Sequence, residues 1–70
     1  MTLQDAAANY AAARHAHQAA TARAQAASAL HTAERTRATR EAMGDAWRAA
    51  DRAMRVMFDA RDLLCQAALS

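Results

Sequence analysis

Residues 42–69 carry apolar side chains at alternating intervals of three and four positions. This stripe consists of Met43, Ala46, Ala50, Ala53, Met57, Ala60, Leu64 and Ala67. Such intervals keep side chains on one side of an α-helix, whereas a strand places them on one side at intervals of two. Polar residues recur with the same period on the opposite side: Asp45, Arg48, Arg52, Arg55, Asp59, Asp62 and Gln66. The pattern predicts one amphipathic helix over about 41–69.

The preceding part of the chain follows the same period with smaller side chains. One stripe consists of Ala6, Tyr10, Ala13, His17, Ala20, Ala24, Ala27 and His31. A second alanine stripe lies on roughly the opposite side, at Ala8, Ala12, Ala19, Ala22, Ala26, Leu30 and Ala33. Small residues allow two helix axes to approach closely, so this helix suits a position between neighbours. With Thr2 as N-cap and Asp5 three positions later, we predict a helix over about 3–33.

The apolar stripes of the two predicted helices are interrupted over residues 34–40, which contain no large apolar side chain. We predict the connection here, with Thr36 or Thr39 as the N-cap of the second helix. Two alternatives stay open, since nothing in this segment breaks a helix outright. The turn could lie at Gly44 and Asp45, or the chain could form one helix of about 65 residues, roughly 100 Å long. The favoured fold is all-α: one domain, residues 1–70, forming a two-helix antiparallel hairpin.

The apolar surface of the second helix is too wide for a single neighbouring helix to cover. We therefore expect the hairpin to assemble as a dimeric helical bundle, a homo-oligomer. Arg61 projects from this surface and should either extend its charge into water or find a carboxylate. Asp5 and Asn9 are the available partners in an antiparallel hairpin. Val56 and Leu63 form a smaller patch, either a second docking site or ordinary surface residues. The candidate oligomer or partner interface is Met43, Trp47, Met54, Met57, Phe58 and Leu64.

Composition agrees with helix throughout, since 24 of 70 residues are alanine and proline is absent. A single cysteine cannot form an internal disulfide. No stretch approaches the ~18 apolar residues of a membrane span, so we expect a cytoplasmic chain without a membrane partner. The net charge is +2, and Arg35, Arg37 and Arg40 are clustered in the predicted connection. These three arginines are the candidate nucleic-acid contacts.

The residues that could carry chemistry are scattered. His15 and His17 point to different sides of a helix, and His31 lies two heptads beyond His17. There is no phosphate-cradling glycine loop, because Gly44 stands alone. We therefore expect no enzyme activity, no catalytic or metal site and no cofactor. The predicted function is a small helical protein-binding module (a regulator, adaptor, chaperone or inhibitor) that acts through a helix face. The alternative is a nucleic-acid-binding regulator that uses the arginine cluster.

Overall fold

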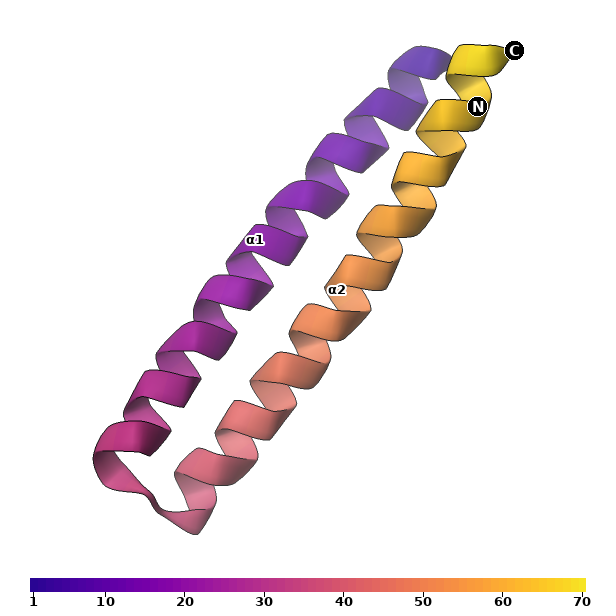
Figure 1. The fold of residues 1–70 in the computed structure, drawn as a ribbon. Coiled ribbons are helices and arrows are strands. Elements are labelled where there is room, and N and C mark those ends of the chain that lie inside the picture. The colour runs from indigo at the N-terminus through magenta and orange to yellow at the C-terminus, as the bar shows by residue number, and fades with distance from the viewer.

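Two helices of nearly equal length lie antiparallel and in contact along their length (Figure 1). The computed structural model describes all of residues 1–70, with α1 spanning Leu3–Glu34 and α2 spanning Arg37–Leu69. Both termini lie at one end and the turn lies at the other, over Cα extents of 51 × 13 × 12 Å. The prediction of an all-helical two-helix hairpin is confirmed, and the single long helix is wrong.

The alternative turn at Gly44 and Asp45 is also wrong, because both residues lie inside α2. A glycine within a helix costs only about 1 kcal/mol relative to alanine. The apolar stripe that faces α1 begins at Met43, so a turn at Gly44 would separate Met43 from the rest of the stripe. The chain reverses instead at Arg35 and Thr36, inside the segment predicted as the connection. That connection is shorter than predicted, because α2 begins at Arg37 and not near residue 41.

Polar side chains and one unusual backbone conformation define the helix ends. The Asp5 N–H donates to Thr2 Oγ1 over 3.1 Å, which makes Thr2 the N-cap of α1 as predicted. Arg35 caps the other end of α1 in the left-handed region, with φ 43° and ψ 48°, and its N–H donates to the His31 carbonyl. Thr36 then begins α2 in a reciprocal capping box with Thr39. Both threonines proposed as caps therefore contribute, which explains the two-residue connection.

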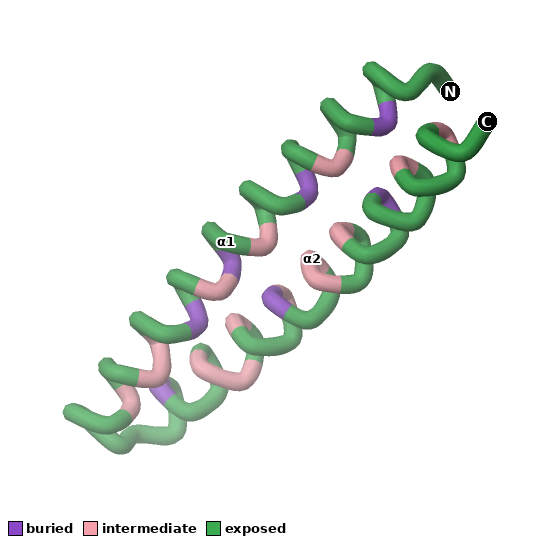
Figure 2. The backbone as a smooth tube through the Cα atoms, turned by 45° about the horizontal axis from the view of Figure 1, so that its top comes forward, coloured by how far each residue is buried: buried purple, intermediate pink, exposed green.

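The contact between the helices is rich in alanine, with Tyr10, His17 and His31 of α1 and Met43, Met57 and Leu64 of α2 as its larger members. Every position of the first α1 stripe and of the α2 stripe is buried or half-buried, whereas the second alanine stripe of α1 is exposed throughout (Figure 2). Thr39 is the one buried polar residue, and no large side chain is fully buried. The hairpin alone thus has a narrow core. Its buried apolar residues are Ala6, Ala13, Ala20, Ala24, Ala50 and Ala60.

Candidate interaction surfaces

A second stripe on α2 lies beside the one that faces α1. It has the same alternating spacing, and we call it the Trp47 face: Gly44, Trp47, Asp51, Met54, Phe58, Arg61, Cys65 and Ala68. Trp47 and Phe58 are each 40% exposed, and Met54 is half-buried. The Trp47 Nε1–H donates to Ser28 Oγ of α1 over 2.8 Å, which fixes the indole against the neighbouring helix. The face therefore presents large apolar side chains to solvent from a rigid support.

The six predicted interface residues divide between two surfaces. Met43, Met57 and Leu64 belong to the stripe that faces α1, and each is half-buried in the hairpin. Trp47, Met54 and Phe58 lie on the Trp47 face. Apolar residues that the sequence groups into one wide face thus lie on two different surfaces of the hairpin. The first three pack toward α1, whereas Trp47 and Phe58 of the second three keep part of their rings in solvent.

Of the two outcomes expected for Arg61, pairing with Asp5 or Asn9 is not seen, and the charge extends into water instead. Its guanidinium lies over the Phe58 ring, with Cζ 4.9 Å from the ring centroid, and its side chain is 54% exposed. The nearest carboxylate is Asp62 Oδ1, 3.9 Å from Nη2. At the edge of the face the charge remains in water while its stem covers an aromatic ring, so it needs no carboxylate from α1.

Asp51, the only acidic residue on the Trp47 face, makes no ion pair within the hairpin. The ion pairs of the structure are Arg37 with Glu41, Arg48 with Asp45 and Arg61 with Asp62. Asp51 and Arg61 are ten positions apart on one helix, about 15 Å along its axis. They cannot meet within one chain, and both are exposed.

A shallow groove lies on the other flank of the hairpin, where Val56 and Leu63 are 59% and 46% exposed. We call it the Val56 groove. Its volume is about 440 Å³, and alanines of both helices form much of its wall. This geometry joins the predicted Val56–Leu63 patch to α1. The lining residues are Asn9, Ala12, Ala13, Val56, Asp59, Ala60 and Leu63.

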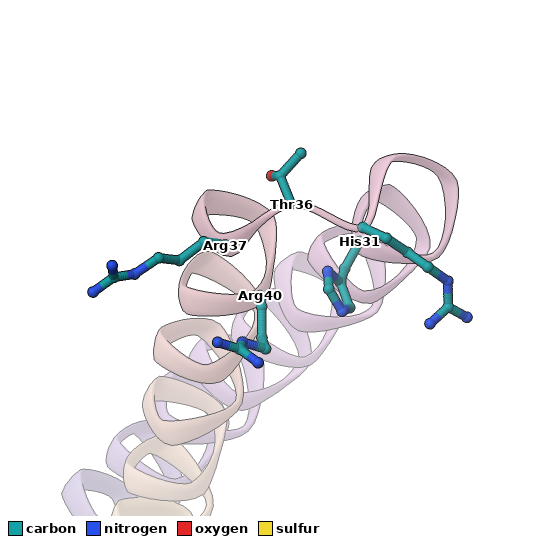
Figure 3. Close-up of a pocket in the computed structure, with 5 residues that line it drawn as sticks. His31, Thr36, Arg37 and Arg40 are labelled. Atoms are coloured by element: carbon teal, nitrogen blue, oxygen red, sulfur yellow. The ribbon is translucent and has the colours of Figure 1, made fainter.

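The turn brings all three candidate nucleic-acid contacts to one end of the molecule (Figure 3). Arg35, Arg37 and Arg40 line an open pocket of about 330 Å³ together with His31 and Thr36. Arg37 points away from the pocket centre and pairs with Glu41 over 3.0 Å, whereas Arg35 and Arg40 form no ion pair. The positive charge at this end is therefore spread outward and is not focused on one point.

His31 also joins α1 to the start of α2. Its Nδ1 lies 2.9 Å from Thr39 Oγ1, and the Thr39 hydroxyl donates to the Thr36 carbonyl over 3.0 Å. Which of these two atoms donates in the first contact depends on the tautomer of the imidazole. Sequence reasoning missed this link and the Trp47–Ser28 bond. Both bonds join residues of different helices, so both depend on inter-helix register.

Comparison with known proteins identifies no relative, since no family model, no curated protein and no solved structure matches the chain. Neither helix has an apolar stretch long enough to cross a membrane. No three metal-ligating side chains lie close enough together to hold an ion. The interpretation of function accordingly depends on the three surfaces described above.

Proposed function

We propose that this chain is a non-enzymatic protein-binding module, a small regulator, adaptor, chaperone or inhibitor, that associates through the Trp47 face and forms a dimeric helical bundle. The observation that carries the proposal is the exposure of Trp47 and Phe58 beside a contact whose buried apolar residues are all alanines. Aromatic residues of this kind dominate the energetics of protein interfaces when a partner covers them. In the isolated hairpin both residues remain partly exposed to solvent.

The surface area of the hairpin supports association. A compact monomer of 7.5 kDa is expected to expose about 4,200 Å². The hairpin exposes 5035 Å², which is about 800 Å² more, because two long helices side by side enclose little volume. A standard stable interface buries about 800 Å² on each partner. Covering one flank of the hairpin would thus lower the exposed area per chain to about the value expected for a compact protein of this mass.

The surfaces favour binding over catalysis. The Val56 groove is open, three of its seven lining residues are alanines, and Asn9 and Asp59 are its polar members. The turn pocket has no apolar lining, and its arginines diverge. Catalytic sites usually combine concave apolar walls with polar groups that converge on a substrate. Neither depression has that combination, and this supports a function of surface recognition.

The experiment compares two aspartate substitutions on opposite flanks of α2. Phe58→Asp places a charge in the Trp47 face, and Val56→Asp places the same charge beside the groove at a more exposed position. Light-scattering mass should fall to that of a single chain for Phe58→Asp and stay at the wild-type value for Val56→Asp. A photoreactive phenylalanine analogue at position 58 should also cross-link to protein in host cells. If position 58 cross-links to no protein and both variants keep the wild-type mass, the proposal fails.

Nucleic-acid binding is the second candidate function, because the turn brings Arg35, Arg37 and Arg40 together. A phosphate interaction would make retention on heparin or labelled RNA fall steeply with salt. It should also fall when Arg35→Ala and Arg40→Ala are combined, since neither arginine is held in an ion pair. Under the protein-binding proposal, this double variant should leave the mass and the position-58 cross-link unchanged.

A further inference from the structure

We infer that the Trp47 face recognises a second copy of this chain in one antiparallel register, in which Asp51 of each protomer meets Arg61 of the partner subunit. The inference rests on the proposed function and specifies the occupant of that surface. Its basis is the charge pattern of the face together with the uncovered area of the hairpin. Two-fold symmetry brings the same patch together from both subunits, so the patch must be complementary to itself.

Helical spacing limits the ways in which the face can pair with itself. Along the Trp47 face the spacing between successive residues alternates between three and four. When two such faces pack antiparallel, a residue followed by a spacing of four lies opposite a residue of the partner subunit that is followed by a spacing of three. With the two-fold axis level with Val56, Met54 lies opposite Phe58 and Trp47 lies opposite Cys65. The centre of the contact is then apolar and the aromatic rings lie on both sides of the axis.

The same register places the two charges of the face opposite each other. Asp51 lies opposite Arg61 of the partner subunit, and symmetry repeats the pair on the other side of the axis. Sliding one subunit by a heptad puts Asp51 opposite Met54 or Ala68 and leaves each charge against apolar or uncharged side chains. Burying an unpaired charge is costly, so the two charges select this register over its neighbours.

Contacts of α1 are compatible with this arrangement. The Trp47–Ser28 bond places Ser28 on the same flank, and heptad spacing adds Thr21 and Arg14 to it. The level of Val56 on α2 corresponds to about residue 19 on α1, since Trp47 and Ser28 are side by side near the turn. An axis at that level places the two copies of Arg14 on opposite sides of it, about ten residues or roughly 15 Å apart along the helices, so the two side chains do not face each other. Both Val56 grooves would then face outward.

The test reverses each charge separately and then mixes the products. Asp51→Arg leaves two arginines opposite each other in its homodimer, and Arg61→Asp leaves two aspartates. Each single variant should weaken dimerisation by on the order of tenfold to a hundredfold, measured by sedimentation equilibrium, because both pairs become repulsive. An equimolar mixture restores an opposite charge at both positions. It should form heterodimers with a dissociation constant within about threefold of wild type.

The doubly reversed chain, Asp51→Arg with Arg61→Asp, should also dimerise like wild type, which shows that neither substitution unfolds the hairpin. If wild type dimerises but the mixture is no tighter than the single variants, the register is wrong although the face still associates. If wild type is monomeric at about 100 µM, a second copy is not the occupant. In that case the dimeric bundle is lost, but a position-58 cross-link to another protein would leave protein binding through the Trp47 face standing. Absence of that cross-link would remove both proposals.

Discussion

Thr39→Val tests how the turn is held together. Valine has nearly the same shape as threonine and keeps the branched side chain, so the substitution removes the hydroxyl with little change in packing. That hydroxyl accepts from the Thr36 N–H over 3.0 Å, donates to the Thr36 carbonyl over 3.0 Å and lies 2.9 Å from His31 Nδ1. Thr39 is 7% exposed, so water cannot fully replace these bonds.

The loss can be estimated bond by bond. A hydrogen bond contributes roughly 0.5–1.5 kcal/mol, and an N-cap interaction about 1 kcal/mol. The capping bond from the Thr39 N–H to Thr36 Oγ1 survives, because it uses the backbone of residue 39. Thr36 is exposed, so water partly satisfies its N–H and carbonyl. We expect a free-energy loss of about 2 kcal/mol, or roughly a 10 °C drop in melting temperature for a domain of this size.

Thermal unfolding followed by far-ultraviolet circular dichroism measures the effect at one fixed chain concentration, because association would make the midpoint concentration-dependent. Thr32→Val is the matched control, since its hydroxyl donates only to the exposed Ser28 carbonyl within α1. It should change the free energy of unfolding by less than about 0.5 kcal/mol. Equal melting temperatures for the two variants would refute the assignment of Thr39 as the link between the helices.

Two further predictions concern the backbone and the alanine contact. Arg35→Gly should raise the melting temperature by several degrees, because the left-handed conformation at φ 43° costs a non-glycine residue about 1 kcal/mol. An unchanged or lower melting temperature would contradict this conformation. Ala24→Leu should destabilise the hairpin by about 1–3 kcal/mol, because Ala24 is fully buried against α2 beside Ala50, whereas exposed Ala26→Leu should be nearly neutral. Similar chemical-denaturation midpoints for these two leucine variants would show that the helices do not approach closely at Ala24.

Local patterns determined much of this fold. The alternating spacing from Met43 to Ala67 and from Ala6 to His31 identified both facing stripes before the helices were placed against each other. Thr36 and Thr39, the two candidate N-caps, located the start of the second helix to within a few residues. These features follow from the helical period and from capping chemistry, which act within a few residues of one another and can therefore be recognised along the chain.

Tertiary structure decided which apolar residues of α2 pack against α1 and which remain exposed. Met57 and Phe58 are neighbours in sequence, yet one packs toward α1 and the other is left on the Trp47 face. Which part of a wide apolar surface is covered depends on where the axis of α1 lies, and alanine contacts set that position. The same holds for Arg61, which the sequence places within the apolar surface and the fold leaves in water over Phe58. Periodicity specifies which side chains share a face, but only packing determines which of those faces remains exposed to a partner.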